Sequence, residues 1–109
     1  MSHTTRTARL TIHLDGATLW RHRPAYIELV QRAHQTGLAG ASVFHGVAGF
    51  AFGPEVRRLR PCMLVLVDGE DRLRLFLLTA QDVLEAARAV AVLDHVQVHE
   101  GAEEAADAG

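Results

Sequence analysis

A run of six apolar residues, Cys62 to Val67, constrains this chain more than any other segment. The run is too short for a core helix and is bounded by Pro61 and Asp68-Gly69, so it predicts a β-strand. A strand with one face in water alternates apolar and polar residues, whereas this run is apolar on both faces. No other predicted element is left to cover the second face. We therefore expect packing against another copy of the chain, the alternative being a strand with a few exposed apolar residues.

Five further segments complete the predicted fold, because a period of two marks strands and a period near 3.6 marks helices. They are a half-buried strand at 8–14, a helix at 24–36 capped by Gly37, a strand at 41–47, a helix at 70–88, and a last short strand containing Val96 and Val98 that ends near His99. The predicted core faces consist of Tyr26, Ile27, Val30 and Ala33 in the first helix and Leu73, Phe76, Leu77, Leu84 and Ala87 in the second. The order β-α-β-β-α-β predicts the α+β class and a ferredoxin-like fold, with two helices on one face of a four-stranded antiparallel sheet.

The distribution of charge separates a body from a tail. The chain has 109 residues, enough for one domain, and its net charge is −2. Residues 1–6 are predicted to be a disordered start, 7–99 the folded domain and 100–109 a disordered acidic tail. The tail holds four acidic residues and no basic one, so eleven basic and nine acidic residues leave the body at +2. A body with so little positive charge argues against nucleic acid as a partner.

The basic residues are all arginine, and the absence of lysine excludes a GxxxxGK[ST] phosphate loop and Schiff-base chemistry. No apolar stretch approaches the roughly 18 residues that span a bilayer. The start, MSHTTRTARL, lacks the apolar segment of a signal peptide, and a single cysteine cannot form an internal disulfide. We therefore expect a cytoplasmic protein.

Beyond these patterns, the chain resembles the PII-like proteins grouped as domain of unknown function 190, distant relatives of the PII nitrogen-signalling proteins. The most specific match is Gly37 to Phe50, which follows the family pattern G-L-A-G-A-[ST]-V-x-x-G-[IV]-x-G-F. A W-x-x-[KR]-P-x-Y pattern runs from Trp20 to Tyr26. Shorter agreements are Ala8 to Ile12, Arg32-Ala33, Val67-Asp68 and Val96 to Val98, so the resemblance covers about residues 8–99.

The resemblance implies a homotrimer of ferredoxin-like protomers that acts as a sensor and not as an enzyme. In PII-like proteins, adenine nucleotides bind in clefts between subunits. A loop between the second and third strands, the T-loop, contacts a regulated partner such as a transporter, a channel or an enzyme. The base of that loop, the loop that opens the second helix and the neighbour's last strand supply the nucleotide contacts.

Two departures from the family pattern modify this expectation. The connection from Phe52 to Pro61 is shorter than the usual loop, and Ala51 replaces a glycine. The loop that opens the second helix, Asp68 to Asp71, contains three acidic residues, which would repel a polyphosphate. We therefore expect AMP, ADP or cyclic AMP in preference to ATP, with no obligatory cofactor.

The candidate nucleotide-binding residues come from three segments. Glycines at a strand end allow close approach to a ligand, although they can equally mark a bulge or a tight bend. Arginines can clamp a phosphate, or they can simply belong to a solvated turn. The candidates are Gly46, Gly49, Phe50, Arg57, Arg58, Asp68, Gly69 and Arg72.

Residues that could support metal binding or catalysis give weaker patterns. His95 and His99 are predicted about 13 Å apart on a strand, too far for one metal. His13 lies on the polar face of the first strand, where three copies could converge on a three-fold axis and bind zinc, or remain simply solvated. Cys62 is predicted to be buried and inert. The sequence therefore predicts neither a metal site nor catalytic residues.

Three functions remain open. The first is a trimeric PII-like regulator that binds an adenine nucleotide and signals to an unidentified protein partner. The second is a ligand-free trimeric adaptor that uses its shortened loop for protein contact alone. The third is a dimeric ferredoxin-like enzyme for a small apolar substrate, with a histidine as base.

Overall fold

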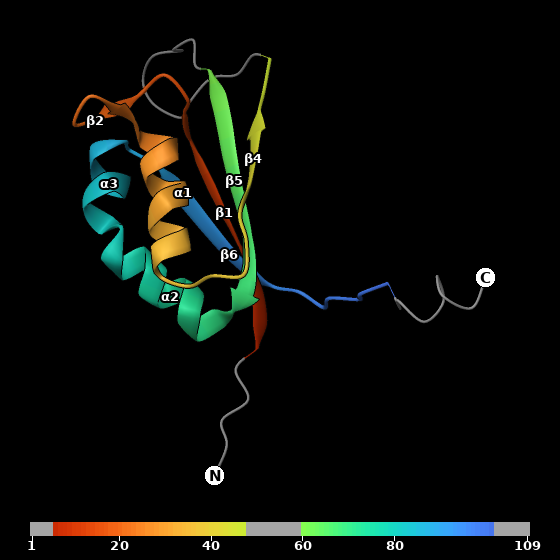
Figure 1. Ribbon diagram of the computed structural model, residues 1–109. Helices are drawn as coiled ribbons and strands as arrows, with labels where there is room; N and C mark the ends of the chain where they lie inside the picture. The colour runs from red at the N-terminus through yellow and green to blue at the C-terminus, as the bar shows by residue number, and fades with distance from the viewer. Residues whose placement is uncertain (1–5, 48–59, 102–109) are drawn as a thin grey trace.

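The computed structural model describes residues 6–47 and 60–101 of the chain. Four strands form an antiparallel sheet in the order β4-β5-β1-β6, and the helices cover one face of it (Figure 1). This is the α+β arrangement that the sequence predicts. The elements are β1 (Thr7–Asp15), β2 (Leu19–Trp20), β3 (Arg23–Pro24), α1 (Ala25–Gln35), β4 (Ser42–His45), β5 (Pro61–Gly69), α2 (Glu70–Thr79), α3 (Gln81–Ala86) and β6 (Val90–His95).

Strand β1 lies at the centre of the sheet and pairs with β5 along its whole length. Its alternation separates the two faces, as the sequence predicts. Every second side chain is buried beneath the helices, namely Ala8, Leu10, Ile12 and Leu14. Arg9, Thr11 and His13 lie on the opposite face of the sheet.

The helices fill the core with a face slightly different from the predicted one. In α1 the buried residues are Ala25, Leu29 and Ala33, whereas Tyr26 and Val30 are only partly buried against the core. Helix α1 begins at Ala25, so Pro24 precedes it. The buried residues of the second helical segment are Leu73, Phe76, Ala80, Val83 and Ala87. Leu77 and Leu84 pack partly against this core.

Strand β5 confirms the predicted strand and extends it at both ends, but only one of its faces is buried in a single chain. Cys62, Leu64 and Leu66 are buried under the helices. Met63 and Val65 are half-buried on the other face, which no described element covers. Exposed apolar side chains from the neighbouring strands extend this open face: Phe44 from β4, and Val90 and Val92 from β6.

Four element predictions were wrong in detail. The helix predicted at 70–88 is two helices, because the chain turns at Ala80, whose φ of −102° departs from helical geometry. The last strand is Val90–His95, and Val96 to His99 continue beyond it outside any strand. The segment between the predicted strand at 8–14 and the predicted helix at 24–36 contains the short β2–β3 hairpin. Strand β4 occupies only Ser42–His45 of the predicted 41–47.

Glycine at position 37 ends α1 for a clear physical reason. Gly37 has a φ of +84°, its N–H donates to the carbonyl of His34, and the N–H of Leu38 donates to that of Ala33. This is the Schellman pattern, in which a left-handed residue lets the last carbonyls of a helix find partners. The predicted C-terminal cap is therefore confirmed.

We predict that Gly37→Ala lowers the free energy of unfolding by about 1–2 kcal/mol, because an L-residue is strained at positive φ. The new Cβ would also lie 3.3 Å from Nη2 of Arg72. Urea denaturation measures the change. Gly40→Ala is the matched control, because a Cβ there meets nothing within 4 Å. Equal stability of the two variants would contradict this explanation.

Candidate functional site

The predicted nucleotide-binding residues lie at two opposite ends of strand β5. Gly46 follows β4 and donates its N–H to the carbonyl of Pro61 at 2.8 Å, at the start of β5. Asp68, Gly69 and Arg72 lie at the other end, where β5 leads into α2. The remaining candidates, Gly49, Phe50, Arg57 and Arg58, lie outside the described residues.

The length of β5 sets the distance between the two groups. Nine residues at about 3.3 Å per residue give a strand roughly 26 Å long. Gly46 and Arg72 of one protomer therefore cannot touch the same small ligand. A site that uses both residues has to combine two protomers, and this part of the prediction stays a prediction.

Gly46 has a structural reason to be glycine. A Cβ at this position would lie 2.9 Å from Cβ of Pro61, closer than carbon atoms can approach without a shift. The glycine therefore lets β4 leave the sheet beside Pro61. Close backbone approach, which the sequence analysis associates with a ligand, here occurs between two segments of the chain itself.

Asp68 ties the loop after α1 to the beginning of α2. Its Oδ2 accepts the N–H of Ala39 at 2.9 Å, and its Oδ1 accepts the N–H of Gly69 at 2.7 Å. Arg72 strengthens the same junction, because its Nη2 donates to the carbonyl of Gly37 at 2.5 Å. Its Nη1 lies 3.7 Å from Oδ1 of Asp68. In this structure, the two charged side chains are engaged by protein groups.

Glu70 links the same junction to the end of β6. One carboxylate oxygen accepts from Nε of Arg74 at 2.7 Å, and the other lies 2.5 Å from Nε2 of His95. The hydrogen bond to His95, followed by that to Arg74, holds the pKa of Glu70 below its usual range. The segment that was predicted to repel phosphate thus has much of its charge balanced locally.

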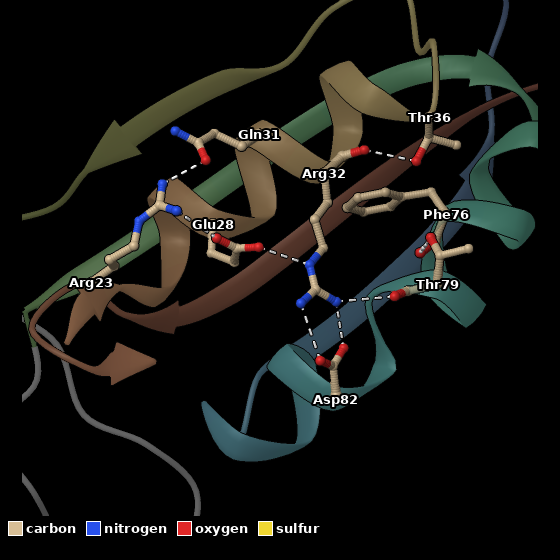
Figure 2. Close-up of polar contacts among 8 residues, drawn as sticks. All are labelled: Arg23, Glu28, Gln31, Arg32, Thr36, Phe76, Thr79 and Asp82. Atoms are coloured by element: carbon tan, nitrogen blue, oxygen red, sulfur yellow. Dashed lines mark hydrogen bonds and ion pairs between the residues drawn. The ribbon is translucent and has the colours of Figure 1, made fainter. Parts of the chain in front are cut away.

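A second polar cluster, which the sequence analysis missed, joins α1, α3 and the β2–β3 hairpin (Figure 2). Arg32 donates to both carboxylate oxygens of Asp82, to Glu28 and to the carbonyl of Thr79. Hydrogen bonding to Asp82 and Glu28 raises the pKa of Arg32, and hydrogen bonding to Arg32 lowers that of Asp82. The helical spacing of Glu28 and Arg32 is a signal for one of these pairs.

Trp20 packs partly against the core, and two guanidinium groups stack on it. Arg21 lies 4.5 Å and Arg32 lies 4.9 Å from the ring centroid, within the range of cation–π attraction. The hairpin is therefore attached to the helical layer through Trp20 and Arg32.

The described ranges contain little that points to a metal or a reactive group. Among residues 6–47 and 60–101, no cluster of three or more His, Cys, Asp or Glu side chains is placed to hold a metal ion. His13 lies exposed on the open face, so convergence of three copies depends on an assembly. Cys62 is buried, as predicted, and burial raises the pKa of its thiol. No described helix is long and apolar enough to cross a membrane.

The fold is similar to that of PII-like proteins. A structure of CPII, a nitrogen regulatory PII-like protein from Thiomonas intermedia K12 bound to ADP, AMP and bicarbonate, superposes with a TM-score of 0.69. It is 18% identical and covers 88% of this chain and 96% of its own. GlnK of B. subtilis, in its ATP complex, has a TM-score of 0.63 at 12% identity, covering 87% of this chain and 85% of its own.

Sequence comparison assigns the family. Residues 7–98 match the family DUF190, described as "Uncharacterized ACR", and the chain belongs to this family. A UPF0166 protein of Aquifex aeolicus (strain VF5) is 32% identical over 63 residues, which cover 50% of this chain and 60% of that protein. The resemblance stated from the sequence is confirmed.

We predict that in the Glu70→Gln variant the free energy of unfolding depends less on pH in the acidic range. A carboxyl group with a lowered pKa in the folded state stabilises the fold above its unfolded pKa, and this contribution disappears as pH falls through the folded pKa. The difference in free energy of unfolding between wild type and variant should therefore be largest at neutral pH and shrink toward pH 2. Denaturation at a series of pH values measures it.

Glu85→Gln, on the exposed side of α3, is the control and should leave the pH profile unchanged, because the carboxylate of Glu85 accepts from the neutral amide of Gln81. A Glu70→Gln profile parallel to that of the wild type would show that His95 and Arg74 do not stabilise the carboxylate.

Proposed function

We propose that this protein is a PII-like regulatory protein: a homotrimer that binds an adenine nucleotide between protomers and reports its state to a partner protein. The observation that carries the proposal is the open sheet face. Phe44, Val90 and Val92 are at least half exposed in the single chain, next to the half-buried Met63 and Val65. An apolar patch of this kind is typical of an interface.

The segment after β6 supports the same assembly. Val96 donates its N–H to the carbonyl of Thr7, and beyond it residues 97–101 run away from the body of the protomer (Figure 1). Val98 is 57% exposed. An extended segment that leaves its own domain is suited to contact a neighbouring protomer. The family resemblance implies such a contact for the last strand.

The nucleotide part of the proposal rests on the relatives and on the division of the candidate residues between the two ends of β5. The CPII structure is bound to ADP, AMP and bicarbonate, and the GlnK structure is a complex with ATP. Because Gly46 and Arg72 lie too far apart in one protomer, a ligand that touches both has to bind between protomers. We expect AMP, ADP or cyclic AMP to bind more tightly than ATP, and regulation of a transporter, a channel or an enzyme in the cytoplasm.

The ligand-free adaptor stays a second candidate because of one observation. Asp68 and Arg72 already have backbone partners from Gly37, Ala39 and Gly69. If these residues serve only the loop after α1, the protein contacts its partner without a nucleotide.

We predict that Val65→Glu converts a trimer into monomers while circular dichroism stays unchanged. A charged carboxylate in an apolar interface loses its hydration without gaining a partner. Light scattering after size-exclusion chromatography measures the mass. Leu78→Glu is the control, because Leu78 is 70% exposed on the helical side. A trimeric Val65→Glu variant would show that the open face is not the interface.

We also predict saturable binding of one adenine nucleotide per protomer in calorimetric titrations of the purified oligomer with AMP, ADP, ATP and cyclic AMP. The affinity for AMP or ADP should exceed that for ATP. If none of the four nucleotides binds to an intact trimer, the result would favour the ligand-free adaptor over the nucleotide sensor. A dimeric mass would instead reopen the enzyme alternative.

A further inference from the structure

Three non-glycine residues in the described ranges have positive φ, and all three are basic residue types. Arg21 and His22 have φ values of 47° and 69°, and Arg88 has 53°. An L-residue in this conformation is less stable than glycine by about 1–2 kcal/mol. Strained backbone of this kind is concentrated at functional sites, so the choice of residue calls for an explanation.

Arg88 shows the contrast with glycine most directly. Its N–H donates to the carbonyl of Glu85, and the N–H of Ala89 donates to that of Leu84, which is the hydrogen-bond pattern found at Gly37. The chain thus ends two helical segments with the same motif. One has the favoured glycine and the other an arginine.

The turn of the β2–β3 hairpin also has basic residues at positions of positive φ. Trp20 pairs with Arg23, so Arg21 and His22 are the two central residues of a two-residue turn. Positive φ at both positions is the type I′ pattern, for which Asn-Gly is the strongest sequence. Here the turn exposes two basic side chains instead, and the guanidinium of Arg21 is held over Trp20.

These residues lie at one end of the molecule. The hairpin follows the end of β1, and the turn at Arg88 leads into Val90, which pairs with His13 near that end (Figure 1). Arg60 belongs to the same end, since its carbonyl accepts the N–H of Gly16. We call Arg21, His22, Arg60 and Arg88 the cationic rim.

The arginines of the rim differ from most of the other described arginines in their ion pairs. Within the described ranges, no carboxylate forms an ion pair with Arg21, Arg60 or Arg88. Carboxylate partners bind the arginines of the other described regions except Arg6, namely Arg9, Arg23, Arg32, Arg72 and Arg74. Two of the three rim arginines without a carboxylate partner in the described ranges, Arg21 and Arg88, therefore lie at positions of positive φ.

The chain itself contains a complementary segment. Its last ten residues hold Glu100, Glu103, Glu104 and Asp107 and no basic residue. This segment leaves from the end of β6 that is opposite to the rim, and residues 97–101 point away from their own protomer (Figure 1). The fourteen residues after His95 can extend to about 46 Å, more than the roughly 26 Å length of the sheet.

We propose that the cationic rim of one protomer binds the acidic C-terminal segment of a neighbouring copy. The proposal rests on the oligomer of the proposed function, and it adds a regulatory consequence. An anionic ligand that reaches the rim has to compete with this segment, so the segment would weaken the binding of such a ligand.

Trp20, the only tryptophan, lies under Arg21 and reports on the rim. The test uses the full chain with Glu100, Glu103 and Glu104 changed to Gln and Asp107 to Asn, which frees the rim. A synthetic peptide of residues 99–109 is then titrated while Trp20 emission is followed. We expect saturable binding that weakens at least tenfold at about 1 M NaCl, where charges are screened within roughly 3 Å.

Arg88→Gly and Arg21→Asn with His22→Gly, introduced separately into this background, should each weaken the peptide at least threefold. Both changes relieve positive-φ strain, so they should raise the melting temperature, and lost binding could not be attributed to unfolding. Arg6→Gln is the matched control, because Arg6 is exposed and lies at the opposite end of β1. Its affinity for the peptide should be unchanged.

The outcomes are distinct. Absence of peptide binding to an intact oligomer, or equal binding by the rim variants and the parent, would overturn the inference and leave the proposed function standing. A difference in Trp20 emission between wild type and the tail variant that persists after dilution to monomers would assign the segment to its own protomer. That result would overturn the intermolecular arrangement.

Discussion

In the described part of the chain, helices cover only one face of the sheet, and most properties of the protein follow from that constraint. The alternation of β1 directs Leu10 and Ile12 into a core that is complete within one chain. The same alternation in β5 leaves Met63 and Val65 half-buried on a face without a described cover. Because a strand cannot bury one face without presenting the other, the fold of the protomer and the need for an interface arise from the same residues.

The two ends of the sheet then acquire different chemistry. Where β5 meets α2, charges are balanced locally: Asp68 accepts two backbone N–H groups, and Glu70 binds Arg74 and His95. At the opposite end, Arg21, Arg60 and Arg88 have no carboxylate partner among the described residues, and the backbone at Arg21 and Arg88 adopts positive φ. The first end is built to hold the chain together, whereas the second presents positive charge to the outside.

The elements that the sequence predicted well are those with strong periodicity or clear boundaries. Strand β1 alternates throughout, the apolar run of β5 lies between Pro61 and Asp68-Gly69, and Gly37 caps α1. The break between α2 and α3 at Ala80 is not marked by a glycine or a proline in the sequence. It depends on the packing of α3 against α1, where Arg32 forms an ion pair with Asp82. The last strand was misplaced because Val96 and Val98 alternate like Val90 and Val92. Only pairing with β1 distinguishes the two segments.

The candidate site illustrates the same limit of sequence analysis. Glycines are easily selected as candidate site residues from a sequence. Gly46 was selected in this way, but its role in the structure is to let β4 pass Pro61. A basic residue in a left-handed turn gives no such signal, since Arg88 resembles any other helix-end arginine until its φ is known. Replacing it by glycine would satisfy the backbone better and remove the charge. Glycine would make this turn more stable, and the chain nevertheless has arginine there. The charge of Arg88 is therefore best explained by a ligand that it binds.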